Sequence, residues 1–66
     1  MKNLVKVERA RKNITQAELA TEMKCNRQTI NSIETKKYIP NVMLVLKMAK
    51  YFNMPVEELF TLDEGD

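Results

Sequence analysis

The sequence of 66 residues has no histidine and no tryptophan, and it has only one cysteine and one glycine. A lone cysteine cannot form an internal disulfide, and without histidine it cannot supply the usual ligand sets of zinc or iron–sulfur centres. General acid–base catalysis lacks its commonest residue, and no glycine-rich loop is present to cradle a phosphate. We therefore expect no metal, no cofactor and no enzymatic activity.

Long apolar runs are also missing. No run approaches the ~18 residues that a membrane-spanning helix needs. The chain is charged from Lys2 onward, so its start lacks the apolar core found in signal peptides. The free Cys25 suits a reducing compartment. We expect a cytoplasmic protein that contacts no membrane, with Cys25 serving as a small buried apolar residue.

The small size of the chain predicts one domain, residues 1–66, with a marginal core. A chain of about 60 residues buries only about 60% of its unfolded surface. Such domains are usually reinforced by disulfides, by a metal or by a partner subunit. Because the first two are excluded, oligomerisation remains, and a homodimer is the expected form.

Charge is distributed unevenly along the chain, although the formal net charge is only +2. Residues 1–37 hold nine basic and four acidic side chains, whereas residues 38–66 hold two basic and five acidic ones. This polarity suggests that the first half meets a polyanion such as nucleic acid. An ordinary solvated surface could give the same counts.

Apolar residues recur at helical spacing, which predicts an all-α protein. Val7, Ala10 and Ile14 indicate a first helix over about residues 4–12. Asn13 then interrupts the pattern, and asparagine tolerates the left-handed conformation that often ends helices. We expect the first helix to end there.

Three further helices begin at recognisable caps. The segment Thr15–Glu18 fits a capping box, in which the hydroxyl and the carboxylate bind free backbone amides. Asn26 is the next good cap, for a helix from Arg27 to about Thr35, and Asn41 caps a fourth helix.

The two ends of the chain carry weaker signals. Pro55 suits the first position of a last helical turn. Residues 5–7 and 60–62 each alternate between apolar and polar side chains, as a short strand does. We expect a small β-ribbon between the two ends of the chain.

The fourth helix is apolar on more than one face. One stripe consists of Val42, Val45, Ala49 and Phe52. A helix that is apolar on two faces is buried on two faces, and in so small a protein the second face is expected to meet another subunit. The candidates for the dimer interface are Met43, Leu44, Met48, Tyr51 and Leu62.

Residues 15–34 follow the helix-turn-helix pattern of two short helices joined by a tight turn. The small side chain of Ala20 allows the close helix approach that this crossing requires. The outward positions at the start of the third helix carry side chains that hydrogen-bond to base edges and phosphates. They are Arg27, Gln28, Thr29, Asn31 and Ser32. A surface selected only for solubility would carry more Glu and Lys, so this segment predicts DNA binding.

These motifs resemble the Cro/C1-type helix-turn-helix family, also called the xenobiotic-response-element family. The resemblance is carried by QAELA at 16–20, RQTI at 27–30, Ile33–Glu34, Lys37–Tyr38 and Pro40. It extends from about Val5 to Phe60. It implies a five-helix Cro/C1-repressor-like bundle that binds operator DNA as a dimer, with the third helix in the major groove.

The resemblance also implies roles for single residues. The base-reading positions are Arg27, Gln28, Asn31 and Ser32. The positions that contact or adjoin the DNA backbone are Gln16, Asn26, Thr29, Lys36, Lys37, Tyr38 and Asn41. Arg9 and Glu34 match a pair that forms a salt bridge between the first and third helices.

Three positions depart from the family pattern. Lys24 and Lys36 stand where glycine is common, at positions that favour positive φ, and a side chain there costs roughly 1 kcal/mol. Glu8 stands where leucine or isoleucine is common. Both lysines add positive charge close to the expected phosphates.

We interpret the chain as a sequence-specific DNA-binding transcriptional regulator, with repression of a palindromic operator by a homodimer as the expected activity. The alternative from another class is a helical protein-interaction module, such as an antitoxin or an adaptor, that works through the fourth helix. Salt-dependent DNA binding would distinguish the two, because protein partners need not respond to counterion release.

Overall fold

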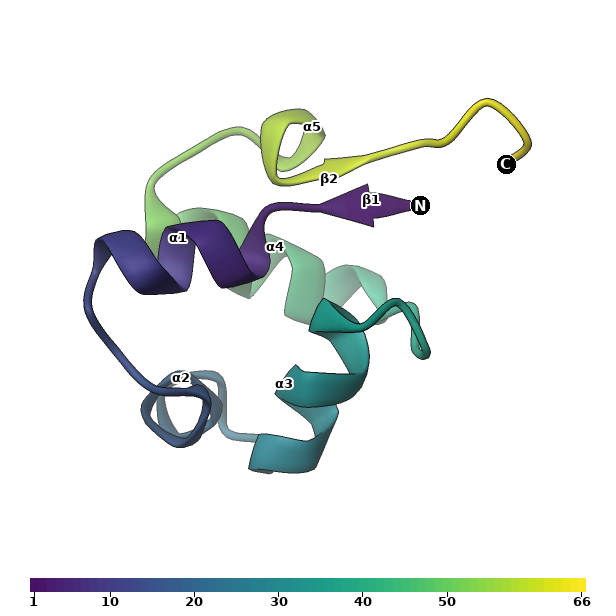
Figure 1. Cartoon of the computed structure of the whole chain (residues 1–66). Helices are drawn as coiled ribbons and strands as arrows, with labels where there is room; N and C mark the ends of the chain where they lie inside the picture. Colours follow the sequence, from purple (N-terminus) through teal and green to yellow (C-terminus); the bar gives the residue numbers. More distant parts are fainter.

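The computed structural model describes all 66 residues and contains five α-helices and one two-stranded antiparallel sheet (Figure 1). The elements are, in chain order, β1 (Lys2–Asn3), α1 (Val5–Arg11), α2 (Gln16–Met23), α3 (Arg27–Glu34), α4 (Val42–Phe52), α5 (Val56–Leu59) and β2 (Phe60–Thr61). The predicted helical bundle with a short terminal ribbon is confirmed. None of the five helices is long and apolar enough to cross a membrane.

Three helices begin at the caps that the sequence predicts. Before α2, the Thr15 hydroxyl oxygen accepts from the Glu18 N–H at 3.1 Å, and the Glu18 carboxylate accepts from the Thr15 N–H at 2.9 Å, which closes the capping box. The side-chain oxygens of Asn26 and Asn41 accept backbone N–H groups at 2.8 and 2.9 Å, before α3 and α4. Pro55 is the N-cap residue of α5 and not its first helical residue.

The first four helices are each followed by a residue with a left-handed backbone. The positive φ angles occur at Asn13 (56°), Lys24 (58°), Lys36 (64°) and Asn53 (55°). After Lys24, the N–H of Cys25 donates to the carbonyl oxygen of Ala20 at 3.0 Å, which satisfies an otherwise free carbonyl at the helix end. The positive φ predicted at both lysines is therefore present, with strain that glycine would avoid.

One hydrophobic core joins the helices. Its buried residues are Val5, Leu19, Ala20, Met23, Ile30, Ile33, Met48, Ala49, Phe52, Leu59 and Phe60. Fully burying a leucine or isoleucine side chain contributes roughly 1.5–3 kcal/mol. Because α2 and α3 together supply five of these side chains, apolar contacts fix the crossing of the two helices.

The inward face of α1 differs from the prediction. Val5 is fully buried, whereas Val7 and Ala10 face solvent. Residues two apart on a helix point in nearly opposite directions, so placing Val5 in the core turns Val7 outward. Glu8 is half-buried, and its carboxylate lies 3.6 Å from the guanidinium of Arg11. The glutamate therefore keeps a charged partner at the edge of the core.

The terminal ribbon forms at a different place on the N-terminal side. β1 pairs with β2 in antiparallel register, with Asn3 opposite Phe60. The predicted strand at residues 5–7 is wrong, because these residues begin α1. Asn3 explains the change: its Oδ1 accepts from the Val5 N–H at 3.2 Å, and its Nδ2 donates to the Ile33 carbonyl at 3.0 Å.

The amino terminus contacts the acidic tail. The Met1 ammonium lies 2.8 Å from a carboxylate oxygen of Asp63 and 2.9 Å from one of Asp66. Hydrogen bonds to the two carboxylates raise the pKa of the ammonium, and the same contact lowers the pKa of Asp66. Acidic groups from the second half of the chain thus neutralise positive charge from the first.

α4 buries one face and exposes the other. Met48 and Phe52 belong to the core, while Val42, Met43 and Leu46 are exposed. Val42 was predicted in the inward stripe and Met48 at the dimer interface, and both placements are wrong. Nearly every position of this helix is apolar, so the tertiary packing and not the sequence period selects the inward face.

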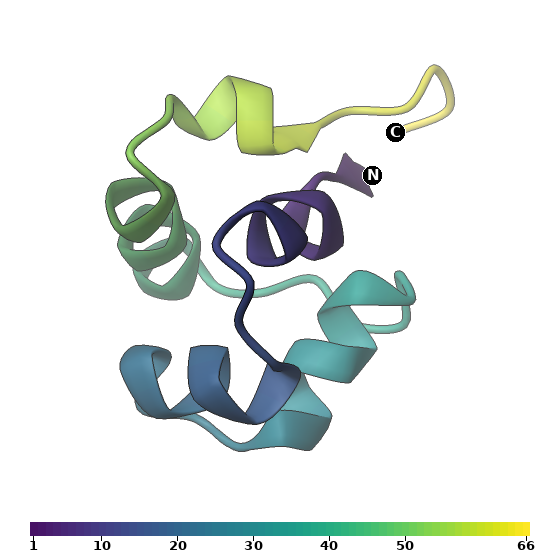
Figure 2. The same ribbon diagram turned by 60° about the vertical axis from the view of Figure 1, so that its left-hand side comes forward.

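α2 and α3 lie on one side of the molecule, and the chain ends lie on another. In Figure 1 and Figure 2, α2 and α3 lie together at the bottom, and α5 with the paired strands lies at the top, beyond α1. The candidate DNA-binding helices are therefore separated from the acidic C-terminal tail.

Candidate nucleic-acid interface

The segment from Gln16 to Glu34 forms the helix-turn-helix. Only three residues separate α2 from α3, and the sharp turn occurs at Lys24, with φ 58° and ψ 42°. The inward residues of both helices belong to the common core, so the outward side of α3 stays at the surface.

The residues predicted to read bases line two polar grooves on this outward side. Arg27, Gln28 and Asn31 alone line a groove of about 270 Å³. Gln28 and Ser32 line a second one, of about 290 Å³, together with Asn26, Thr29 and Tyr38. All four predicted base-reading residues and three of the predicted backbone contacts therefore share one surface.

Four of the groove-lining side chains, and the two lysines that follow α3, form no hydrogen bond or ion pair within the protein. They are Arg27, Gln28, Ser32 and Tyr38, with Lys36 and Lys37. No buried side-chain nitrogen or oxygen lacks a hydrogen bond, so these free groups are accessible to solvent. The arrangement offers donors and acceptors to an external ligand.

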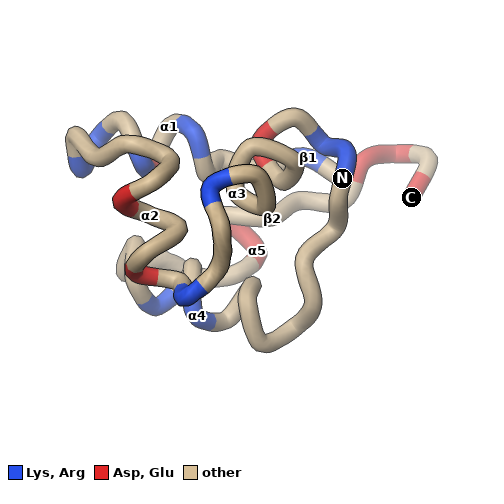
Figure 3. Tube along the Cα trace, turned by 90° about the horizontal axis from the view of Figure 1, so that it is seen from below, with Lys and Arg blue, Asp and Glu red and all other residues tan.

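Positive charge dominates the same segment. The only acidic residue between Arg27 and Tyr38 is Glu34, and its side chain is 3% exposed. Lys36 and Lys37 are exposed directly after α3. Figure 3 views the molecule from this side, and the acidic C-terminal tail lies at the end remote from α2. A polyanion can therefore approach α3 without meeting the acidic tail.

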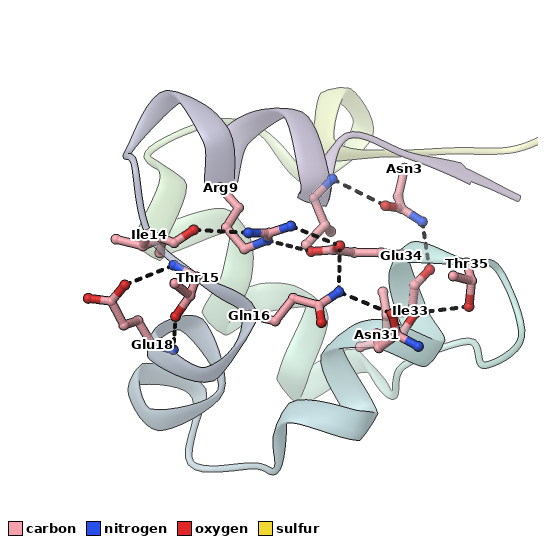
Figure 4. A network of polar contacts seen from close by, with 11 residues as sticks. Asn3, Arg9, Ile14, Thr15, Gln16, Glu18, Asn31, Ile33, Glu34 and Thr35 are labelled. Carbon is pink, nitrogen blue, oxygen red and sulfur yellow. Dashed lines mark hydrogen bonds and ion pairs between the residues drawn. The ribbon is translucent and has the colours of Figure 1, made fainter.

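An ion pair beneath this surface joins α1 to α3 (Figure 4). The Nε of Arg9 donates to Oε2 of Glu34 at 2.8 Å, and its Nη2 donates to Oε1 at 3.3 Å. A third donor, Nη1, binds the carbonyl of Ile14 at 3.0 Å. The two side chains are only 17% and 3% exposed, so salt screens the pair little. The forked contact holds the carboxylate in one orientation.

Gln16 extends the ion pair toward the outer side of α3. Its Nε2 donates to Oε1 of Glu34 at 3.0 Å and to Oδ1 of Asn31 at 3.1 Å. A side-chain amide nitrogen carries two N–H groups, so none remains to donate to a phosphate. The Gln16 side chain therefore has no free N–H group for the predicted contact with a phosphate.

The capping residues combine a structural bond with a free group. Oδ1 of Asn26 accepts from both the backbone N–H and the hydroxyl of Thr29, at 2.8 and 2.9 Å. The hydroxyl hydrogen of Thr29 is therefore already used. The Nδ2 groups of Asn26 and Asn41 make no bond within the protein and can donate to phosphates.

Cys25 lies half-buried in the turn between α2 and α3 and packs against the core. Burial raises the pKa of its thiol, although the positive charge of Lys47 acts in the opposite direction. The thiol therefore stays protonated at neutral pH, and the nucleophilic thiolate is scarce.

Sequence reasoning did not find the contact between Gln16 and Asn31 or the link from Asn3 to α3. The partners lie 15 and 30 residues apart, and no local pattern relates them. The sequence shows only that Gln16 is a polar residue at the start of a helix, which does not identify its partners.

Comparisons with known proteins agree with this geometry. Residues 5–59 match the helix-turn-helix family. The chain is 41% identical over 66 residues to the uncharacterized HTH-type transcriptional regulator MJ0272 of Methanocaldococcus jannaschii, covering 100% of both chains. It is 42% identical over 64 residues to the uncharacterized HTH-type transcriptional regulator YgzD of Bacillus subtilis, covering 97% of each. An uncharacterized HTH-type regulator of Archaeoglobus fulgidus is 41% identical over 66 residues, covering 100% of this chain and 93% of its own.

The family match extends over both helices of the motif, the core and α4. It agrees with the surface of free donors on α3, and it points to a regulator of transcription and not to an enzyme. The chain belongs to the Cro/C1-type helix-turn-helix family of DNA-binding transcriptional regulators.

Proposed function

We propose that this regulator is a repressor that binds a palindromic operator as a homodimer. In each half-site α3 enters the major groove, and repression follows from occupying promoter DNA, without chemistry or a cofactor. The proposal places the protein with the chromosome, in the cytoplasm.

The observation that carries the proposal is the groove lined by Arg27, Gln28 and Asn31. Arginine pairs with guanine, and glutamine or asparagine pairs with adenine, through donors and acceptors in the major groove. Ser32, on the same side of α3, can bond to either kind of base. These four residues supply the sequence specificity.

Phosphate contacts on both flanks of α3 fix the register of the protein on the duplex. On one flank is the start of α2, beside Arg27. On the other flank are Asn26 and Tyr38, which line one groove, and the neighbouring Lys36, Lys37 and Asn41. Thr29 supports this surface through its bond to the cap and not through a donor of its own.

We further propose that a second copy of the chain covers the exposed apolar surface at the start of α4. It consists of Ile39, Val42, Met43 and Leu46, which are between 54% and 73% exposed. Residues 38–46 contain no charge, so a twofold contact between identical surfaces brings no like charges together. Exposed apolar patches of this kind mark interaction sites.

This surface revises the interface predicted from the sequence. Met43 remains in this surface, whereas Leu44 and Tyr51 are half-buried and pack against the core, and the fully buried Met48 is removed. Leu62 stays a candidate because the terminal ribbon borders the same loop: Phe60 and Ile39 line one small cavity.

The dimer surface also adjoins the DNA surface. Tyr38 begins the uncharged segment and lines the second reading groove. A twofold axis through the start of α4 would therefore place the α3 surfaces of both copies next to the dimer contact. The proposal requires a separation of about 34 Å, one turn of the duplex.

Selection of bound duplexes from a random DNA pool tests the proposed function. We expect an enriched motif with two symmetric half-sites, and an affinity that falls steeply with salt because several phosphates are neutralised. The absence of any enriched motif, or half-sites without a symmetric partner, would contradict the proposal. Salt-independent binding to another protein would favour the interaction module instead.

A further inference from the structure

The network in Figure 4 determines which way two side-chain amides point. The carboxylate of Glu34 can only accept, so Gln16 must turn its NH₂ group toward it. The second N–H of that nitrogen donates to Oδ1 of Asn31 at 3.1 Å. If Asn31 were turned over, two NH₂ groups would face each other without an acceptor. The charged Glu34, held by Arg9, therefore sets the orientation of both amides.

This orientation leaves one group of Asn31 free. Its Nδ2 donates to no atom of the protein, while Oδ1 is engaged by Gln16. Asn31 is exposed and lines the groove that Arg27 and Gln28 also line. The group that it offers to a ligand in that groove is therefore a donor.

We propose that Gln16 and Glu34 are positioning residues that make Asn31 a hydrogen-bond donor in the major groove. This inference rests on the proposed function. Guanine, adenine and thymine each present an acceptor on the major-groove edge, whereas cytosine presents only its amino donor. Asn31 therefore discriminates against cytosine at the base it contacts. The preference at one base pair is set by two residues that do not touch that base.

Gln16→Met tests the positioning role directly. Methionine has a similar length but no N–H group, so the variant removes the restraint on Asn31 and leaves Asn31 itself unchanged. The released amide can turn and accept from the amino group of cytosine. We expect discrimination against cytosine to fall at least about five-fold at one base pair, with the preferences elsewhere retained.

Asn31→Asp identifies that base pair, because aspartate can only accept. We expect its preference to shift toward cytosine at the position where Gln16→Met loses discrimination. Lys37→Gln is the matched control, since it removes a phosphate contact outside the network. It should weaken binding to all sequences alike. Thermal melting of each variant checks that the fold is intact.

The outcomes separate this inference from the proposed function. If the wild type enriches no motif, both fail. If it enriches a motif and Gln16→Met weakens all sequences alike, then Gln16 is a phosphate contact, and the positioning role is overturned while the proposed function stands. The same holds if Asn31→Asp changes no base preference.

Discussion

Single residues on and around α3 differ in whether their hydrogen-bonding groups are already used within the protein. Arg27 and Gln28 have no partner within the protein, so DNA can supply their first one. Thr29 and Gln16 use their side-chain donors internally. The first kind is suited to reading bases, and the second kind to holding the reading surface in place.

Removing a base-reading side chain should change sequence preference. Gln28→Ala or Arg27→Ala is expected to cost about 1–3 kcal/mol and to relax the preference at particular base pairs. Lys37→Ala should instead weaken binding to all sequences and reduce the salt slope by about one. Titrations against the selected site and its single-base variants, at several salt concentrations, measure both effects. A uniform loss from Gln28→Ala would move that residue out of the base-reading set.

Removing Glu34 should chiefly destabilise the fold. Glu34→Ala leaves Arg9 without its charged partner in a largely buried position, and breaking such a pair costs about 3–5 kcal/mol. Denaturant unfolding measures the loss. Glu22→Ala is the matched control, because this acid on α2 is exposed and makes no ion pair. A variant at Glu34 with an unchanged midpoint would show that the pair contributes little.

Single residues could be predicted where their physics is local. Thr15, Asn26 and Asn41 satisfy amides within one turn, and the sequence alone identifies them. Gln16 and Asn31 meet only because α2 crosses α3 at one angle. That angle depends on the packing of the whole core, so the composition of α3 suggests DNA reading but not the restraint on Asn31.

At the scale of elements, two of the four left-handed residues that follow helices are lysines. Lys24→Gly should raise the free energy of unfolding by about 0.5–1 kcal/mol, because it removes the clash of Cβ with the backbone. The gain is limited by the larger conformational freedom of glycine in the unfolded chain. Asn13→Gly, where asparagine already tolerates the conformation, should change stability less. Thermal unfolding compares the two, and a destabilised Lys24→Gly would contradict the strain.

Lys36→Gly should show the same gain in stability together with weaker DNA binding. Lys36 stands after α3, on the flank where phosphates are expected. Lys24, in contrast, lines a hollow with Lys47 and Tyr51 and neither of the two grooves on α3, so its expected place beside phosphates is not supported. Lys24→Gly should therefore leave DNA affinity nearly unchanged, and the comparison separates backbone strain from charge.

The sequence predicted where the helices begin better than which face of each helix is buried. Capping residues placed the starts of α2, α3 and α4 correctly. In α4 almost every position is apolar, so the pattern could not decide that Met48 turns inward and Val42 outward. β1 has only two residues, too few for any period, and its position depends on the tertiary bond from Asn3 to Ile33.

In the whole molecule, the mainly basic residues 1–37 and the mainly acidic residues 38–66 do not form two separate parts of the structure. The Met1 ammonium and Lys2 lie beside Asp63, so part of the basic half is neutralised by the acidic tail. The charge that remains unpaired near α3 is that of Arg27, Lys36 and Lys37. The polarity predicted from the sequence survives because the tail lies away from α2 (Figure 3).

The proposed dimer would link this charged surface to operator binding. The double variant Val42→Glu and Leu46→Glu places like charges on both sides of the proposed contact. Both side chains are exposed, so helix content measured by circular dichroism should persist. Sedimentation should show monomers at concentrations on the order of micromolar. Operator affinity should fall because the second half-site is no longer engaged by a linked subunit.

The matched control is the pair Leu4→Glu and Val7→Glu, which adds the same charge to exposed apolar positions around α1. It should stay dimeric. A Val42 and Leu46 variant that also remains a dimer would place the interface elsewhere, with Leu62 and the terminal ribbon as the next surface to test. A wild type that is monomeric at high concentration would leave the apolar start of α4 to a different protein, because a contiguous apolar surface is costly to leave in water.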